Sequence, residues 1–292
     1  YIGSVPFHYS LLSLICNAET VPSGWNILSG TSQDLVVYVP ASSIDLYKND
    51  SEWNERTIKE ISSSLPVEGS FEVVDYGNYS LKYTIRNNVE LAECEVTCVE
   101  MPNVPTAIVI PSKVTIKGAE FDVTVVENEA FKDCANLTSI EIPSGVTYIG
   151  SSAFYSCSGL TNVAFAENSQ LTYIGGSAFR GCSSLSSIEI PSGVTSIGYY
   201  TFYGCSSLAD VTFGENSQLT SIGSYAFENC SSLASIEIPS GVTSIESYAF
   251  RGCSSLSSIE IPSGVTSIGY DAFYGCSSLA DVTFGENSQL TS

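Results

Sequence analysis

Apolar residues return at fixed positions through the second half of the chain, each time as a phenylalanine followed three residues later by a cysteine. The spacing is 23 or 25 residues, and the phenylalanines are Phe131, Phe154, Phe179, Phe202, Phe227, Phe250 and Phe273. Self-similarity at a period of about 20 to 50 residues is typical of a solenoid. A solenoid presents a long surface rather than an enclosed pocket, so the period constrains the function as well as the fold.

Each copy has the order Leu-x-x-Ile-x-Ile, a turn, Val-x-x-Ile-Gly and Ala-Phe-x-x-Cys. Ile188 and Ile190 alternate with polar residues, and this period of two predicts a strand with both isoleucines on one face. Pro191 follows directly and has no N–H to donate, so we expect the strand pairing to end there. The stretch around Phe202 is too short for more than one helical or 3₁₀ turn. We therefore predict a mostly β solenoid in which each coil adds one principal strand to a continuous parallel sheet.

The motif Cys-x-x-Leu-x-x-Ile-x-Ile-Pro, followed by Val-x-x-Ile-Gly and Ala-Phe, resembles the BspA-like class of leucine-rich repeats. That class is found on bacterial surface and secreted proteins and in some protists. The match covers residues 127–292 directly. The resemblance implies a leucine-rich-repeat solenoid with parallel strands, a β-cap and a short closing helix. It also implies a secreted or cell-surface location and attachment to host matrix proteins and to other cells.

The flanking segments resemble caps of the same family, which suggests two arrays in tandem. Residues 1–66 resemble the end and closing cap of an upstream array, with helix confined largely to residues near 43–55. Residues 67–129 resemble a β-rich opening cap with a turn at Lys117-Gly118, and residues 130–292 hold the seven repeats. The chain opens with Tyr1-Ile2-Gly3, which matches the interior of a repeat, and stops at Ser292 before the next expected Ile-Gly. We therefore expect a piece of a longer protein, with any targeting sequence left out.

The strongly negative charge of the chain excludes some classes of binding partner. The net charge is −21, and residues 133–292 hold thirteen acids but only two bases, Arg180 and Arg251. Such a surface repels phosphate backbones and anionic headgroups, so we expect no nucleic-acid partner. No apolar run approaches the roughly 18 residues of a membrane span, so we expect no direct membrane insertion of this segment.

Cysteine and histidine usage gives no sign of catalytic chemistry. Seven of the ten cysteines share one phase of the repeat. Their side chains should point the same way, whereas a disulfide needs converging Cβ vectors, so we predict buried thiols. His8 is the single histidine, so we expect no Cys/His zinc site. With no nucleophile elbow and no phosphate-binding glycine loop, we predict no catalytic residue, no metal, no cofactor and no enzyme activity.

Carboxylates that flank the inward isoleucines, on the strand face that we expect to be concave, are the candidate partner-binding residues. They are Glu141, Glu189, Asp210, Glu237, Glu260 and Asp281. Neighbouring coils would place them roughly 5–7 Å apart, where like charges in water repel by under about 1 kcal/mol per pair. They form either a solvated polar face or an acidic strip that receives a basic partner or weakly holds Ca²⁺.

Tyrosines are the second candidate surface, on the convex and bend segments, where they either cover the repeat edge or serve recognition. They are Tyr148, Tyr155, Tyr173, Tyr199, Tyr200, Tyr203, Tyr225, Tyr248, Tyr270 and Tyr274. Three functional classes stay open. The first is a binding or adhesion module for a host matrix protein, another cell-surface protein or a glycan. The second is a structural spacer that holds another domain away from the surface, and the third is a carbohydrate-processing accessory with an aromatic platform.

Overall fold

The computed structural model describes residues 13–15, 36–39, 44–49, 57–60, 69, 71–76, 79–87, 93–98 and 107–291. The chain divides into two compact units, the second comprising Gly69–Arg86 and Glu93–Ser292. The described elements of the first unit are β1 (Ser13–Ile15), β2 (Val36–Val39), α1 (Ile44–Asn49) and β3 (Thr57–Glu60). The strands form a parallel sheet in the order β1-β2-β3, and α1 lies within the range expected for a closing helix. His8 and Cys16 lie outside the described residues.

The second unit opens with a β-cap, as expected. Its strands are β4 (Phe71–Asp75), β5 (Ser80–Asn87), β6 (Glu93–Cys98), β7 (Ala107–Val109), β8 (Lys113–Ile116) and β9 (Ala119–Val126). Strand β4 pairs with β5 and β8 pairs with β9 in antiparallel fashion, whereas β6 pairs with β9 in parallel. The turn between β8 and β9 is formed by Lys117 and Gly118, which both have a positive φ (50° and 85°). The cap therefore supplies the first strand, β9, on which the coils stack.

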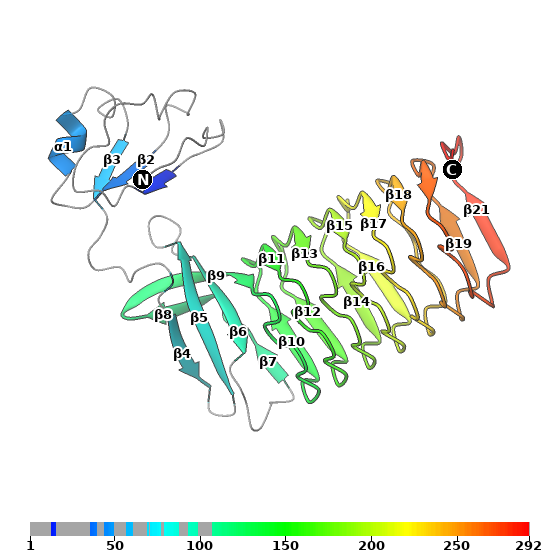
Figure 1. Ribbon diagram of the computed structural model, residues 1–292, viewed down its shortest axis with the longest axis horizontal. Helices are drawn as coiled ribbons and strands as arrows, with labels where there is room; N and C mark the ends of the chain where they lie inside the picture. The colour runs from blue at the N-terminus through cyan, green and yellow to red at the C-terminus, as the bar shows by residue number, and fades with distance from the viewer. Residues whose placement is uncertain are drawn as a thin grey trace. The chain divides into compact units, whose positions relative to one another are not determined.

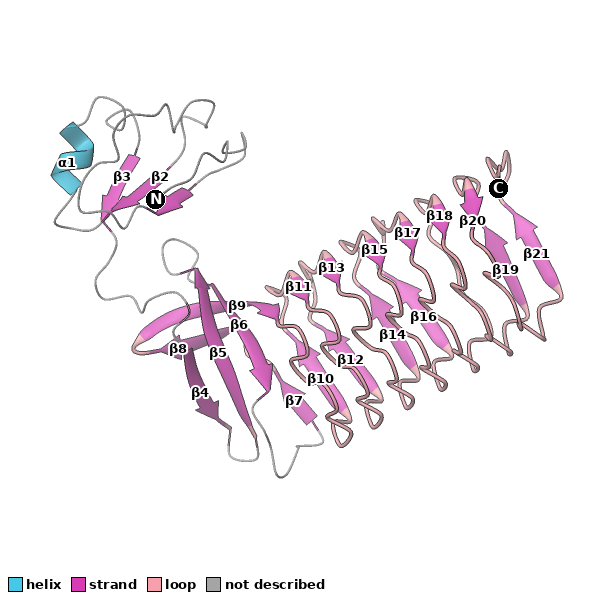
Figure 2. Ribbon diagram, viewed as in Figure 1, coloured by secondary structure: helices cyan, strands magenta, loops and turns pink. Residues whose placement is uncertain are grey.

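Each coil of the array has two strand positions, which lie in two rows (Figures 1 and 2). The longer strands are β10 (Ser139–Ile142), β12 (Asn162–Phe165), β14 (Ser187–Ile190), β16 (Asp210–Phe213), β19 (Ser258–Ile261) and β21 (Asp281–Phe284). The two-residue strands are β11 (Tyr148–Ile149), β13 (Tyr173–Ile174), β15 (Ser196–Ile197), β17 (Ser221–Ile222), β18 (Ser244–Ile245) and β20 (Ser267–Ile268). All pairings between coils are parallel, as the sequence predicts.

The continuous sheet lies on the other side of the coils from the one predicted. The two-residue strands join β9, β6, β5 and β4 in one 11-stranded sheet, with β8 beside β9. The longer strands, which were expected to be continuous, pair in separate groups, β7-β10-β12, β14-β16 and β19-β21. Residues 235–238 occupy the longer-strand position of their coil without forming a strand. We call the row of longer strands and residues 235–238 the long-strand face.

A proline follows the long-strand position at each interruption of the long-strand face. Between β14 and β16 the ladder continues past the strand ends, because the Gly214 N–H donates to the Ile190 carbonyl oxygen at 2.9 Å. The residue that follows β14 itself is Pro191, which has no N–H to donate towards β12. Pro239 and Pro262 stand at the same position at the other two breaks within the array. The strands that precede these prolines end directly before them, as predicted, but proline alone does not break the sheet, because Pro143 follows β10 and β10 still pairs with β7.

The core is a stack of phenylalanine rings along the axis of the solenoid, as predicted. Ring centroids in successive coils lie between 5.1 and 5.5 Å apart, with interplanar angles between 1° and 11°. The rings from Phe131 to Phe250 are fully buried, while Phe273 in the last complete coil is half-buried. Each ring from Phe154 to Phe250 therefore packs against two neighbours, and stability is shared between adjacent coils.

The cysteines of the array line the core as free thiols. Each thiol from Cys157 to Cys276 donates a hydrogen bond to the carbonyl oxygen of the phenylalanine one coil earlier, at 2.9–3.2 Å. Five are buried, and Cys134 and Cys276 are half-buried. The side chain of Cys98 lies outside the described part of the chain. These cysteines serve as small core residues whose S–H groups also bind the preceding coil through a hydrogen bond.

Candidate functional site

The six candidate carboxylates are exposed on the long-strand face. They do not form the single closely spaced strip that we expected. In the register of the strands, Glu189 is opposite Thr212, and Asp210 is opposite Ser187. Glu141 is opposite Ala164, and β19 and β21 repeat the arrangement of β14 and β16. The acids thus occupy two columns that are offset by two residues along the strand.

This register sets the separation of the charges. A two-residue offset combined with one strand spacing places Cα atoms such as those of Glu189 and Asp210 roughly 8 Å apart. The expected separation of roughly 5–7 Å is therefore too short for such pairs. Ala164 stands between Glu141 and Glu189 in one column, whereas Glu237 and Glu260 take the same position in successive coils and keep roughly the one-strand spacing that we expected. The interposed neutral residues reduce the repulsion that a continuous ladder of carboxylates would create.

A groove of about 640 Å³ crosses the long-strand face over β12, β14 and β16. Its lining includes four carboxylates, Glu167, Glu189, Asp210 and Glu215, and it contains no lysine, arginine or histidine. Asn162, Asn168, Ser187, Ser192 and Thr212 contribute further polar groups. Glu189 and Asp210 were predicted from the sequence, whereas Glu167 and Glu215 were missed because they lie in the turns that replace Pro-Ser-Gly. We call this feature the acidic groove.

The acidic groove is not arranged as a metal site. No group of three or more histidine, cysteine or acidic side chains gathers closely enough to bind a metal ion anywhere in the described ranges. The column offset explains this, since it keeps the carboxylates apart. What the groove offers instead is several separate acceptors of one sign, which suits a chain of spaced donors.

A second candidate surface lies along the turns that carry the phenylalanines. The residue two places before each phenylalanine has a positive φ between 51° and 60° in every coil. Glutamate, serine or aspartate occupies this position in four coils, but Tyr200, Tyr225 and Tyr248 occupy it in three successive ones. The left-handed conformation costs a bulky residue about 1–2 kcal/mol.

Stacking offsets part of that cost. The Tyr200 and Tyr225 rings lie 4.6 Å apart, and those of Tyr225 and Tyr248 lie 4.7 Å apart, with planes within 10°. Such pairs contribute about 0.5–1.5 kcal/mol each. Because Tyr225 is covered on both faces, the stack presents ring edges and hydroxyl groups rather than a flat platform. Tyr148 and Tyr173 form a similar stacked pair on β11 and β13.

The position directly after each phenylalanine holds a cation, a tyrosine or, in one coil, a glutamate. The sequence places Lys132, Tyr155, Arg180, Tyr203, Glu228, Arg251 and Tyr274 there in successive coils. The Arg180 guanidinium lies 5.6 Å from the Tyr155 ring centroid, 5.0 Å from that of Tyr200 and 4.7 Å from that of Tyr203. Arg251 lies 5.5 Å from both Tyr248 and Tyr274. Sequence reasoning treated both arginines only as part of a charge count.

The two arginines differ in their charged partners. Arg251 lies 3.3 Å from the Glu228 carboxylate, which is almost fully buried, whereas Arg180 has no carboxylate within 4.0 Å among the described residues. Burial raises the pKa of the Glu228 carboxyl, and the charges of Arg251 and Arg180 partly offset this rise. Tyr199, which is 58% exposed, stands beside Tyr200 with its ring edge-on at 5.7 Å. We call Tyr155, Arg180, Tyr199, Tyr200, Tyr203 and Tyr225 the tyrosine–arginine patch.

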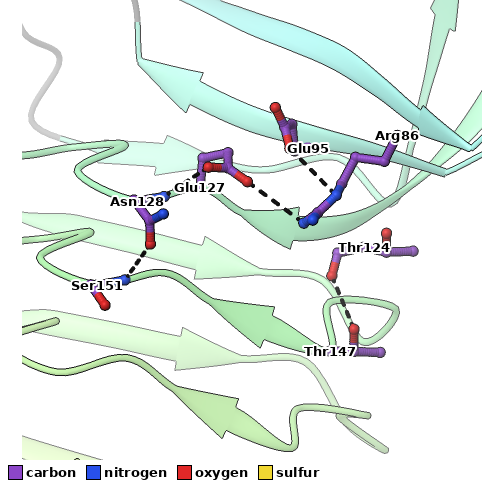
Figure 3. A network of polar contacts seen from close by, with 7 residues as sticks. All are labelled: Arg86, Glu95, Thr124, Glu127, Asn128, Thr147 and Ser151. Atoms are coloured by element: carbon purple, nitrogen blue, oxygen red, sulfur yellow. Dashed lines mark hydrogen bonds and ion pairs between the residues drawn. The ribbon is translucent and has the colours of Figure 1, made fainter. Parts of the chain in front are cut away.

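A polar network joins the β-cap to the first coil (Figure 3). Arg86 of β5 lies 3.5 Å from the Glu95 carboxylate of β6 and 3.6 Å from that of Glu127, which follows β9. Burial, and then hydrogen bonding to Glu127, raises the pKa of Glu95 to about 7. Next along the chain, the Asn128 side-chain oxygen accepts the Ser151 N–H at 2.7 Å. This network therefore fixes the entry into the array and contains a carboxyl group that titrates near neutral pH.

Comparisons with known proteins identify the repeat. A family model for the BspA type leucine rich repeat region, with six copies, matches residues 124–218 and 216–292. Among solved structures, a leucine rich cell surface protein from Faecalibacterium prausnitzii A2-165 is 34% identical, with a TM-score of 0.64. The match covers 74% of this chain but 56% of that protein, so the chain spans little more than half of its length. A search of curated proteins finds no match.

Two further solved structures are similar over most of this chain. The pneumococcal vaccine antigen PcpA is 22% identical, with a TM-score of 0.49, over 76% of this chain and 72% of its own. A T. pallidum leucine rich repeat protein is 25% identical, also with a TM-score of 0.49, over 75% of this chain and 91% of its own.

Proposed function

Because this chain belongs to the BspA type leucine-rich repeat family, we propose that it is a non-enzymatic binding module of a bacterial cell surface. Its acidic groove receives a basic segment of a protein partner. The cell-surface description of the F. prausnitzii relative supports the location. No helix in the described part of the chain is long and apolar enough to cross a membrane.

The acidic groove is the observation that carries this proposal. Its volume of about 640 Å³ lies within the range of about 300–1,000 Å³ that is typical of binding clefts. Its four carboxylates are exposed and face no base within the groove, so their charge is available to a ligand. A cleft lined by one sign of charge concentrates counter-charged partners and speeds their association.

The separation of the carboxylates suits lysine and arginine side chains on an extended segment. Side chains that point the same way along an extended chain recur about every 6.6 Å. The Cα atoms of Glu189 and Asp210, in the two columns of the groove, lie at a similar distance, roughly 8 Å. The net charge of −21 adds a long-range attraction for a basic protein, which salt weakens as the Debye length falls to about 8 Å.

The test compares two variants that lose the same charge. In the groove variant, Glu167, Glu189 and Glu215 become Gln and Asp210 becomes Asn. In the control variant, four acids outside the groove lining become Gln, namely Glu237, Glu246, Glu260 and Glu286. The probe is a fluorescent decapeptide of alternating lysine and serine, titrated by anisotropy at low and physiological salt. A panel of extracellular-matrix proteins is then screened on immobilised wild-type and variant proteins.

We expect the groove variant to bind the peptide at least about tenfold more weakly at low salt, with a shallower salt dependence. The control variant should keep most of the affinity. Equal losses in both variants would show that net charge alone attracts the peptide and that the groove is not the site. If the groove variant bound every matrix protein as well as the wild type, the face would be a solvated surface and the array a spacer.

A further inference from the structure

We infer that the tyrosine–arginine patch is a second protein-docking site, in which Arg180 pairs with a carboxylate side chain of the partner and the tyrosine edges pack around it. This surface differs from the acidic groove in position and in the charge it selects. It does not depend on the function proposed for the groove.

Residues 133–292 hold two bases against thirteen acids, and both bases lie over tyrosine rings. Arg180 contacts the rings of Tyr155, Tyr200 and Tyr203. These contacts hold the guanidinium in place without using its hydrogen-bond donors, which match a planar carboxylate. Arg180 is half-exposed, so those donors are within reach of a partner.

The chain contains its own comparison for Arg180. The windows 181–221 and 252–292 are identical except that Tyr200 and Thr201 become Asp271 and Ala272, and each window follows an arginine. The arginine before the second window, Arg251, already pairs with Glu228 at 3.3 Å. At the position that Glu228 occupies one coil before Arg251, the coil before Arg180 has Tyr155. Arg251 is therefore paired within the fold, whereas Arg180 is presented on an aromatic surface with no carboxylate within 4.0 Å among the described residues, and Glu228 acts on it only through longer-range charge attraction.

The geometry of the rings favours a protein over a glycan. A sugar ring packs on the open face of an aromatic ring, but Tyr200 and Tyr225 stack on each other, and Arg180 lies over Tyr203. The Tyr199 ring lies against Gly176, where an added Cβ would come within 2.4 Å of a ring carbon. What remains outward is a set of ring edges, hydroxyl groups and one guanidinium. Tyrosine and arginine are the residue types that dominate binding energy at protein interfaces.

The test uses matched pools of capped heptapeptides with neutral residues around a central Glu in one pool and Gln in the other. Binding to immobilised protein is measured for the wild type, the groove variant and three further variants. Arg180→Gln removes the proposed donor, and Arg251→Gln is the matched control. The double variant Tyr200→Asp with Thr201→Ala gives the patch the sequence that the fold already accommodates in the second window. Melting temperatures confirm that each variant is folded.

We expect the wild type to prefer the Glu pool, and Arg180→Gln to weaken that binding roughly tenfold and abolish the preference. The double variant should also lose the preference, whereas Arg251→Gln and the groove variant should retain it. Equal binding of both pools, or equal effects of the two arginine variants, would overturn the proposal. So would displacement of the Glu pool by hyaluronan but not by an unlabelled Glu peptide, since the site would then select glycans.

Discussion

The Cys205 thiol donates a hydrogen bond of 3.1 Å to the carbonyl oxygen of Phe179, a residue 26 positions earlier in the chain. The bond ties the end of one turn to the aromatic turn of the coil before it. Each array cysteine from Cys157 to Cys276 makes the equivalent bond, so the thiols connect the Phe-bearing turns of neighbouring coils. The cysteine therefore recurs at the same position of every repeat for a structural reason, and no redox chemistry is needed to explain it.

The buried thiols should be unreactive in the folded protein. Burial raises the pKa of Cys205 to about 12, so almost no thiolate is present near pH 8. We expect a thiol reagent to modify at most the half-buried Cys134 and Cys276 of the array quickly. After unfolding without reductant, close to ten groups should react. Rapid modification of Cys182, Cys205 or Cys230 in the native protein would contradict this burial.

Core truncation should cost more in the middle of the array than at its end. Phe202 stacks on both neighbours and is fully buried, whereas Phe273 is half-buried. Phe202→Ala should lower the free energy of unfolding by about 3–5 kcal/mol, and Phe273→Ala by clearly less. Urea unfolding followed by circular dichroism measures both. Equal losses at the two sites would contradict stabilisation by neighbouring coils.

The Glu95 carboxyl should make stability depend on pH. Burial and the neighbouring Glu127 raise its pKa to about 7, above the unfolded value of about 4.3. The folded state therefore holds this proton more tightly, and the associated stability is present below about pH 4 and lost as pH rises through about 7. Arg86 and Lys82 limit the shift.

Glu95→Gln should flatten this part of the profile, because the amide mimics the protonated acid at every pH. The measurement is the urea midpoint from pH 5 to pH 8. Glu141→Gln, on the exposed long-strand face, is the control and should keep the wild-type slope. Identical slopes for the wild type and Glu95→Gln would exclude Glu95 as the source.

Close approach of neighbouring coils should make Gly175 intolerant of a side chain. An added Cβ would come within 2.5 Å of the Ser151 backbone nitrogen, whereas at Gly204 it would meet nothing within 4 Å. Gly204 has a φ of 71°, so its replacement by alanine should cost only about 1–2 kcal/mol of backbone strain. Gly175→Ala should cost more, since backbone atoms must move. A smaller thermal shift for Gly175→Ala than for Gly204→Ala would contradict this packing.

The sequence predicted the parts of the fold that repeat, because a fixed period places equivalent side chains in one column. The Phe stack and the parallel pairing follow from that period. The continuous sheet was assigned to the wrong strands. The missing N–H of Pro191 indicated only that the ladder towards the preceding coil would be one hydrogen bond short, and Pro143 follows β10 without preventing its pairing with β7.

The candidate sites depended on relations between coils. Asp210 follows Leu208 by two residues, whereas Glu189 follows Leu185 by four, so their different columns could have been read from the sequence. In the same way, the sequence shows that Tyr155 occupies the repeat position of Arg180 one coil earlier, which predicts a tyrosine rather than a carboxylate beside it. What no pattern could supply is the contact geometry, such as the position of its guanidinium between rings.

The proline breaks give the solenoid unequal stiffness on its two sides. A continuous hydrogen-bonded ladder on one side resists extension along the axis, while the three interruptions on the long-strand face leave gaps that can open at little enthalpic cost. A pulling or bending load would therefore concentrate its strain at these gaps. One of them, between β12 and β14, lies within the acidic groove. Mechanical tension on the chain would therefore change the spacing of the groove's carboxylates.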